Sequence, residues 1–341
     1  MPSTRPRVVF TDGKCNACHY HATKASVNWA DRKEQFLELV KEKKRHPAYD
    51  CVVPFSGGKD SAAIAYRLKF ELGLNPLLVC YGQMLWTEAG KHNFESVCNA
   101  GFDIDYIRVN QDVSRKLAKR FFIERGHPKA HYDAGINAAP VIAARDRGIP
   151  LIIYAEHGDS SYGGLVLNEE STRVRDLEEV LEHCVGDDAR NWATDGITEA
   201  DLFNYIYPDD VDHLEAVYFT YYFPFDVYEN ALLCKDKFNF QWIEPRTDGS
   251  FEGWDSIDDA IDGLDFFMMW KKFGFGRATR MASRMVNYGH MTTEQARKYI
   301  EMYDGEYPKM YLPEVLEYLD MTQEEFDAVI ETHDEKITEA A

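Results

Sequence analysis

The stretch FSGGKDSAA, residues 55–63, has two glycines, a lysine and two serines, and its first residue ends the short apolar run DCVVPF. A glycine-rich loop between a buried strand and a helix points free backbone N–H groups, and the positive end of the helix dipole, at one place. Glycines let the backbone approach an oxyanion closely, and a lysine adds a full positive charge. We therefore expect this loop to bind the phosphates of a nucleotide. Its residues would be Pro54, Ser56, Gly57, Gly58, Lys59, Asp60 and Ser61.

The loop differs from a Walker A motif, which needs a glycine five residues before its Gly-Lys pair and Ser or Thr after the lysine. Val53 and Asp60 stand at those positions. SGGKDS instead resembles the PP-loop of the ATP-pyrophosphatase superfamily, which implies cleavage of ATP between its α and β phosphates. That fold would hold adenine near Tyr81 and Gly82, although core packing is an equal interpretation of these two residues. A glycine turn without a ligand is the alternative for the loop.

Alternating apolar runs and helical segments surround the loop. Strands are expected at 50–55, 76–81, 103–109 and 149–156, and helices at 60–72, 88–100, 112–125 and 136–147. Continuous apolar strands separated by helices indicate an open parallel sheet that is covered on both faces. We predict an α/β fold with an adenine-nucleotide α-hydrolase-like parallel sheet over about 50–160. A small N-terminal appendage that contains cysteines and a helical C-terminal region would flank it.

Four regions follow from these patterns. They are an appendage with a C-x₂-C knuckle and a helix at 1–48, the ATP-binding domain at 49–165, an insertion or substrate region at 166–255, and a helical region at 256–335 that packs on the ATP site. The first long helix should cover 28–46, with Asn28 as its N-cap. Residues 160–255 show no clean period and suggest loops with a few helices. N-caps of C-terminal helices are expected at Ser256, Thr292 and Thr322.

The run YAEHGDSSYGG follows the fourth expected strand. Glu156 would emerge at the carboxyl end of the sheet, where a carboxylate could hold Mg²⁺ or orient an attacking amine. The alternative is that Glu156 caps a turn. Tyr162, Gly163 and Gly164 would form a tight loop that faces the substrate.

The run KKFGFGRATR, residues 271–280, lies between two expected helices. Gly276 permits a sharp turn, and Arg277 and Thr279 would open the next helix. A helix start with an arginine is a second place where an anion could bind. An ordinary turn between helices, with a solvated arginine, is the alternative.

The run CNACHYH places Cys15 and Cys18 in the C-x₂-C spacing of a zinc knuckle. Such a knuckle supplies two ligands, whereas zinc needs four, and the chain contains no second C-x₂-C. A Zn²⁺ site would therefore be incomplete in this sequence. Four scattered cysteines are interpreted as small buried apolar residues: Cys51, Cys80, Cys98 and Cys184.

Composition excludes several classes of protein. The 341 residues include 38 Lys and Arg against 58 Asp and Glu, a net charge of −20 that disfavours a nucleic-acid partner. Seven cysteines spread over a long chain do not resemble a secreted disulfide framework. No apolar run approaches the roughly 18 residues of a membrane helix, and the start lacks the apolar core of a signal peptide. We expect a cytoplasmic protein without a membrane segment.

Seven runs together resemble the N-acetyl sugar amidotransferases of bacterial surface-polysaccharide and lipopolysaccharide O-antigen biosynthesis. In family order, over about residues 4–308, they are TRPRVVFTDGKCNAC, YDCVVPFSGGKDS, GLNPLLV, IPLIIYAEHGDSSYGG, YYFPFDVYEN, FGFGRAT and YDGEYP. The resemblance implies an ATP- and Mg²⁺-dependent reaction on a nucleotide-linked N-acetyl sugar. The acetamido carbonyl oxygen is adenylated, and ammonia then displaces AMP to leave an acetamidino group.

The resemblance also implies partners and roles. A glutaminase and a cyclase-like protein would supply ammonia, since this sequence shows no glutaminase nucleophile of its own. Lys59 would stabilise the leaving pyrophosphate, Asp60 would cap the helix or help to bind Mg²⁺, and Arg277 would hold a phosphate of ATP or of the acidic sugar nucleotide. In that family a further C-x₂-C precedes the stretch that begins here at Met1. We therefore expect either a trimmed start or a member that has lost half of the knuckle.

Two rival functions share the loop. One is a PP-loop enzyme that modifies tRNA by thiolation or lysidine formation, against which the net charge of −20 counts. The other is an ATP-binding scaffold without catalysis, which would release no pyrophosphate. A homo-oligomer is left open.

Overall fold

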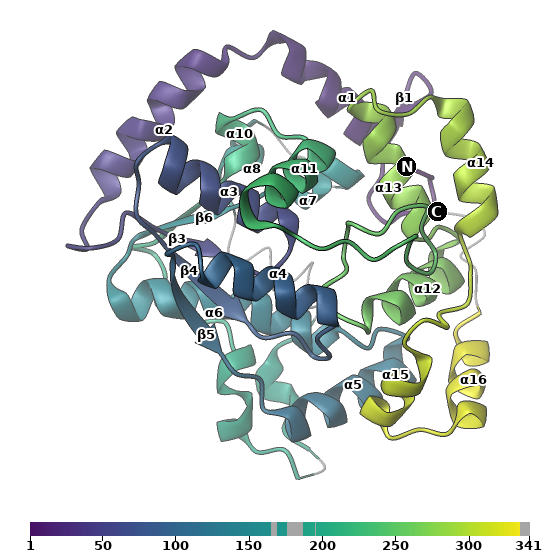
Figure 1. Ribbon diagram of the computed structural model, residues 1–341. Coiled ribbons are helices and arrows are strands. Elements are labelled where there is room, and N and C mark those ends of the chain that lie inside the picture. The colour runs from purple at the N-terminus through teal and green to yellow at the C-terminus, as the bar shows by residue number, and fades with distance from the viewer. Residues whose placement is uncertain (165–168, 176–186, 195, 335–341) are drawn as a thin grey trace.

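The computed structural model describes residues 1–164, 169–175, 187–194 and 196–334. Five strands form one sheet in the order β5-β4-β3-β6-β7, left of centre in Figure 1. The strands are β3 (Cys51–Pro54), β4 (Pro76–Tyr81), β5 (Asp103–Ile107), β6 (Leu151–Tyr154) and β7 (Glu215–Tyr218). All neighbouring pairs are parallel. The predicted α/β fold with an open parallel sheet is confirmed.

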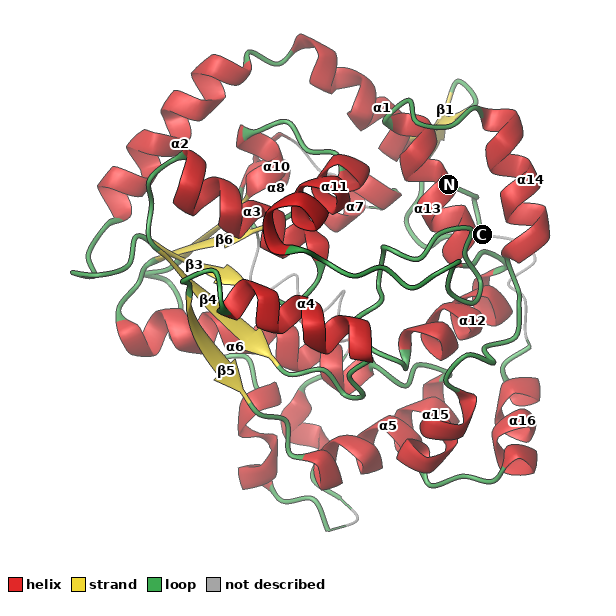
Figure 2. Cartoon of the chain, in the orientation of Figure 1, coloured by secondary structure: helices red, strands yellow, loops and turns green. Residues whose placement is uncertain are grey.

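Helices cover both faces of the sheet (Figure 2). They include α2 (Trp29–Lys43), α3 (Lys59–Tyr66), α4 (Glu88–Cys98), α5 (Gln111–Arg125), α6 (Ala130–Arg147) and α11 (Val227–Phe238). Successive strand residues enter opposite cores because side chains alternate along a strand. Val52 and Ile152 pack on the face of α5 and α6, whereas Val53 and Ile153 pack on the face of α2, α3 and α11. Burial on both faces explains the uninterrupted apolar runs.

Most predicted helices occur where they were expected. Asn28 caps α2, since its side chain accepts hydrogen bonds from the backbone N–H groups of Ala30 and Asp31. α3 continues as a π-helical turn, η2 (Arg67–Glu71), before Gly73. α6 begins at Ala130 rather than at 136. Among the predicted buried cysteines, Cys51 and Cys80 are buried and Cys98 is half-buried, while Cys184 lies outside the described residues.

The N-terminal appendage is a short hairpin followed by helices. Its elements are β1 (Phe10–Thr11), β2 (Lys14–Cys15), α1 (Asn16–Thr23), η1 (Lys24–Ser26) and then α2. α1 packs on α7 (Gly158–Tyr162), the short helix that follows β6. The appendage thus touches the segment in which Glu156 and Tyr162 lie.

The region that lacked a clear sequence period contains a strand of the sheet. β7 pairs with β6 along its whole length, from Leu151 opposite Glu215 to Tyr154 opposite Tyr218. The expectation of a sheet confined to about 50–160 was therefore wrong. The other described elements here are α8 (Glu169–Arg173), η4 (Ala189–Trp192), η5 (Glu199–Tyr205), α10 (Phe219–Tyr222) and α11.

The C-terminal region is helical, as predicted. Its helices are α12 (Asp262–Phe273), α13 (Arg277–Asn287), α14 (Thr293–Tyr303), α15 (Leu312–Leu319) and α16 (Gln323–Thr332). Thr292 and Thr322 form capping boxes at the starts of α14 and α16. The N-cap expected at Ser256 was wrong, because α12 starts only at Asp262. The intervening chain is held to the sheet instead, since the Asp259 carboxylate accepts a hydrogen bond from the backbone N–H of Met84 at 3.0 Å.

Among the described helices, none combines the length and the apolar composition that crossing a bilayer requires.

Candidate active site

A cleft of about 740 Å³ opens at the carboxyl ends of β3, β4 and β6. The order of the strands changes direction between β3 and β6, and ligands of open α/β sheets bind at such switch points. Predicted site residues from three segments meet in this cleft. They are Pro54, Ser56, Gly58, Lys59, Asp60, Ser61, Tyr81, Glu156 and Tyr162. The glycine loop, the end of β4 and the run after β6 therefore face one space.

The glycine loop has the backbone geometry that the sequence predicted. Gly57 has a φ of +94°, and a Cβ atom there would lie only 3.1 Å from the ring of Trp86. Gly58 is the N-cap of α3 and offers no side-chain cap. Within the described part of the chain, no side chain accepts a hydrogen bond from the first-turn amides of 59–61. These amides and the helix dipole are therefore available to an anion in the cleft.

Lys59 is 7% exposed and lies between two carboxylates. Its Nζ is 2.8 Å from Oδ2 of Asp60 and forms a shorter ion pair with Asp255. Burial lowers the pKa of Lys59, but Asp255 and Asp60 outweigh that effect, so its pKa is raised overall. Asp60 in turn accepts a hydrogen bond from Asn230 Nδ2 at 2.9 Å. The ammonium group is thus charged and fixed at the start of α3.

Two arginines of α13 that the sequence analysis did not single out, Arg280 and Arg284, also line the cleft. Both donate hydrogen bonds to the hydroxyl of Tyr162, Arg280 at 2.9 Å. That hydroxyl donates to Glu156 Oε1 at 3.0 Å. Arg284 also lies 3.4 Å from Glu156 and 3.8 Å from Asp60. Burial raises the pKa of Tyr162 to about 12 although both arginines oppose the shift, so the phenol keeps its proton at neutral pH.

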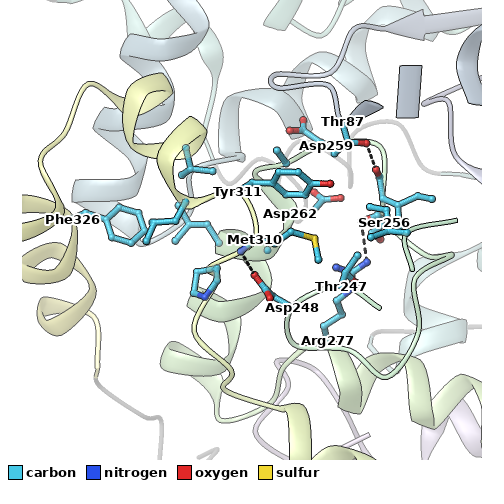
Figure 3. Close-up of a pocket in the computed structure, with 18 residues that line it drawn as sticks. Thr87, Thr247, Asp248, Ser256, Asp259, Asp262, Arg277, Met310, Tyr311 and Phe326 are labelled. Atoms are coloured by element: carbon cyan, nitrogen blue, oxygen red, sulfur yellow. Dashed lines mark hydrogen bonds between the residues drawn. The ribbon is translucent and has the colours of Figure 1, made fainter. Parts of the chain in front are cut away.

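The predicted second anion site at the start of α13 is filled by the protein itself. The backbone N–H groups of Gly276 and Thr279 donate to the Asp304 carboxylate at 2.9 and 3.0 Å. Arg277 donates to backbone carbonyls, that of Ser256 at 2.9 Å, and lines a separate cavity of about 30 Å³ (Figure 3). A space of that size holds one or two water molecules rather than a nucleotide. Gly276, Arg277 and Thr279 are not among the residues that line the large cleft.

Four further predicted glycines, Gly57, Gly82, Gly163 and Gly164, lie outside the lining of the cleft, and Gly57 lines a small separate cavity instead. Gly82 continues the sheet, because its N–H donates to a carbonyl at the end of β5 at 3.0 Å. Gly163 and Gly164 bind the N-terminal segment. Their carbonyl oxygens accept hydrogen bonds from Arg5 Nε, at 2.6 Å, and from Asn16 Nδ2. The loop that was expected to face the substrate therefore anchors the appendage, and only its Tyr162 reaches the cleft.

The side of the cleft at the end of β4 is aromatic and polar. Gly135 of α6 leaves room for the Tyr81 ring, since a Cβ atom there would come within 2.3 Å of it. Gln83 Nε2 donates to the carbonyl oxygen of Ser56 at 2.7 Å and to the Asp258 carboxylate. The glycine loop is thereby connected to the segment that precedes α12.

A charged group lies at the α6 wall. Lys129 forms an ion pair with Asp262 and lies 4.7 Å from the centre of the Tyr132 ring. Burial raises the pKa of Asp258 to about 7, and Asp262 adds to the shift while Lys129 opposes it. Asp258 is therefore the carboxylate of this cleft whose charge changes near neutral pH.

The described residues do not fit a closed zinc site. The sulfur atoms of Cys15 and Cys18 lie 3.4 Å apart, at the junction of β2 and α1. Within the described ranges, no His, Cys, Asp or Glu joins them to make a group of three metal ligands. Cys18 contacts the side chain of Asn287 at 3.4 Å. The pair thus links the appendage to the end of α13, and we assign it no chemical step.

Residues 248–339 match a family described as WbpG-like LPS biosynthesis proteins, over its C-terminal domain. The matching segment contains α12 to α16 and contributes Asp255, Arg280 and Arg284 to the cleft. No curated protein matches the chain. The C-terminal part of the chain is therefore similar to a domain of LPS biosynthesis proteins, and it forms one wall of the candidate site.

Sequence reasoning missed Asp255, Arg280 and Arg284 for different reasons. Asp255 belongs to no local motif, and it meets Lys59 only because the chain returns to the glycine loop. Arg280 and Arg284 are four residues apart on one helix, so they share a face. That spacing of two arginines on one helix face was the available sequence signal.

Proposed function

We propose that the protein is an AMP-forming amidotransferase of LPS biosynthesis. It would adenylate the acetamido oxygen of a nucleotide-linked N-acetyl sugar and replace that oxygen with ammonia to give an acetamidino group. The observation that carries the proposal is the uncapped first turn of α3, which opens beside Lys59 into the same cleft as Glu156. The similarity of residues 248–339 to a domain of LPS biosynthesis proteins supports this class of pathway.

In the first step the loop would hold the β and γ phosphates of ATP. The acetamido oxygen attacks the α phosphorus, the bond between the α phosphorus and its bridging oxygen breaks, and pyrophosphate leaves. Lys59 and the amides of the first turn stabilise the charge that grows on the leaving group. Preorganised donors of this kind are worth about 10²–10³-fold in rate. Mg²⁺ binds phosphates together with one or two carboxylates, and Asp60 is the carboxylate beside the loop.

In the second step ammonia attacks the imidate carbon. A C–N bond forms, the nitrogen loses one proton, and the C–O bond to AMP breaks, which leaves a protonated acetamidine. Glu156 would accept that proton. The Tyr162 hydroxyl donates to one Glu156 oxygen and Arg284 lies 3.4 Å away, so the carboxylate is held in one orientation. Ammonia would come from a partner glutaminase or from solution.

The test is an isotope experiment with the full chain. The protein is incubated with ATP, Mg²⁺, ammonium and a panel of nucleotide-linked N-acetyl sugars that carry ¹⁸O in the acetamido group. We expect AMP and pyrophosphate in equal amounts, with the ¹⁸O in AMP. Release of ADP, or AMP without the label, would contradict the mechanism. AMP formation that requires RNA instead of a sugar would favour the tRNA-modifying alternative.

A further inference from the structure

Two guanidinium groups of the cleft form no ion pair with a carboxylate of the described residues. Arg5, from the N-terminal segment, and Arg280, from α13, both line the cleft. Within the described part of the chain, no carboxylate oxygen lies within 4.0 Å of a guanidinium nitrogen of either residue. Arg5 donates to the Gly163 carbonyl, and Arg280 donates to the Tyr162 hydroxyl. Both acceptors are neutral, so the two charges are not neutralised by direct contact.

The two arginines lie around one ring. The guanidinium carbon of Arg5 is 5.7 Å from the centre of the Tyr162 ring, and that of Arg280 is 4.4 Å from it. Burial lowers the pKa of Arg5, the charge of Arg280 lowers it further, and Asp159 opposes the shift. The two like charges repel each other, and partial removal from water strengthens the repulsion. An anion in the cleft that contacts both guanidinium groups would relieve this repulsion.

Three carboxylates of the cleft already pair with other cations. Asp60 and Asp255 pair with Lys59, while Glu156 pairs with Arg284. Arg284 is 2% exposed, and its Nε has no hydrogen-bond partner within the described residues. Near the glycine loop, three carboxylates thus surround the two cations Lys59 and Arg284, whereas Arg5 and Arg280 lie beyond them around Tyr162.

We propose that Arg5 and Arg280 bind the diphosphate of the second, sugar-bearing substrate, at a subsite separate from the loop that binds ATP. Guanidinium groups are well suited to this because they present paired N–H donors to phosphate oxygens. Tyr162 holds Arg280 in place by accepting its hydrogen bond. The inference rests on the proposed function for the sugar, while the diphosphate is argued from the arginines alone.

The experiment measures two affinities on the same variants by calorimetry. The first ligand is the Mg²⁺ complex of α,β-methylene-ATP, which cannot be cleaved between the α and β phosphates. The second is UDP-N-acetylglucosamine, with UDP, UMP and GDP-mannose as comparison ligands, added after the first ligand has saturated the loop. Variants are Arg5→Gln, Arg280→Gln and Arg280→Lys. Arg297→Gln, at an exposed position of α14, removes the same charge as a control.

We expect Arg280→Gln and Arg5→Gln to raise the dissociation constants of UDP-N-acetylglucosamine and UDP about tenfold or more, because each variant loses hydrogen bonds to a charged group. Arg280→Lys should recover part of the loss. The affinity for α,β-methylene-ATP should stay within about twofold of that of Arg297→Gln, and UMP should bind more weakly than UDP. Circular dichroism melts check that each variant is folded.

Three outcomes would overturn the inference. The first is an equal loss of affinity for α,β-methylene-ATP and for UDP-N-acetylglucosamine in Arg280→Gln. The second is an unchanged affinity for UDP-N-acetylglucosamine in both Arg280→Gln and Arg5→Gln. The third is the absence of any binding of a nucleoside diphosphate by the wild-type protein. Failure of the proposed function is a separate result. A wild-type protein that binds UDP through Arg280 but forms no AMP would reject the amidotransferase proposal and leave this subsite in place.

Discussion

Lys59, in the glycine loop, and Asp255, 196 positions later in the chain, form a buried ion pair at the floor of the cleft. The pair connects the start of α3 to the segment before α12. Burial raises the pKa of Asp255, but Lys59, Arg284 and Arg280 together outweigh that effect and lower the pKa overall. Both groups therefore remain charged at neutral pH, and the ammonium group is held where phosphate oxygens would arrive.

This pair predicts that loss of activity and loss of stability can be separated. Lys59→Met should abolish AMP formation and destabilise the fold by about 3–5 kcal/mol, because it leaves a buried carboxylate unpaired. The double variant Lys59→Met/Asp255→Asn should regain most of that stability and remain inactive. Urea denaturation and the AMP assay measure the two effects. If the double variant regains activity, Lys59 does not stabilise the leaving pyrophosphate.

The cap of α13 gives a second prediction. Asp304→Ala should destabilise the protein by about 2 kcal/mol, because the amides of Gly276 and Thr279 lose their acceptor. Asp304→Asn keeps one acceptor oxygen and should therefore lose less stability than Asp304→Ala. Since α13 carries Arg280, the KM for the sugar nucleotide should rise more than the KM for ATP. Asp236→Ala, at an exposed position of α11, is the matched control for denaturation. Equal melting temperatures for Asp304→Ala and Asp236→Ala would contradict the role of Asp304 as the cap of α13.

The raised pKa of Asp258 predicts a dependence of stability on pH. Its folded value of about 7 is above the ordinary 3.8, so the folded state binds the proton more tightly than the unfolded state does. The contribution of Asp258 to the free energy of unfolding is therefore largest below about pH 4, and it is lost as the pH rises to about 7. Asp258→Asn removes the ionisation. Its melting temperature relative to wild type should increase between pH 5 and pH 8, and a constant difference would contradict the assigned pKa.

The central fold was readable from the sequence because its signals are local. The apolar runs at β3, β4 and β6 and the caps at Asn28, Thr292 and Thr322 each lie within a few residues of the feature that they predict. β7 was missed because it lies in a segment so rich in aromatic residues that no alternation separates strand from loop. The N-cap expected at Ser256 was wrong because a tertiary contact overrides the local preference. The Asp259 carboxylate accepts hydrogen bonds from the backbone N–H groups of Met84 and Leu85, in the turn after β4.

The residues of the candidate site likewise include some that a local motif predicts and some that only the fold reveals. The loop residues Ser56 to Ser61 form a sequence motif, and the structure places most of them in the cleft. The start of α13 carries the same kind of signal, yet the structure fills it with Asp304. A helix start shows where an anion could bind, but only the fold decides whether the protein already supplies one. Asp255 and Arg5 could not be found locally, since each reaches the site through contacts with distant segments.

Glu156 gives the last prediction, which separates the two chemical steps. Glu156→Gln keeps an oxygen that can accept the hydrogen bond from Tyr162 but removes the base. We expect acetamidine formation to fall about 10²–10⁴-fold, the usual range for loss of a general base. Exchange of labelled pyrophosphate into ATP, which reports only adenylation, should stay within about threefold in the presence of the sugar.

Glu301→Gln, at an exposed position of α14, controls for the loss of a carboxylate. Because a base acts only on the attacking nitrogen, raising the ammonium concentration should not restore the Glu156→Gln rate to that of the control. If pyrophosphate exchange falls in parallel with acetamidine formation, Glu156 acts in adenylation. In that case its carboxylate belongs with Asp60 among the groups that would bind Mg²⁺, and the half-saturating Mg²⁺ concentration should rise in the same variant.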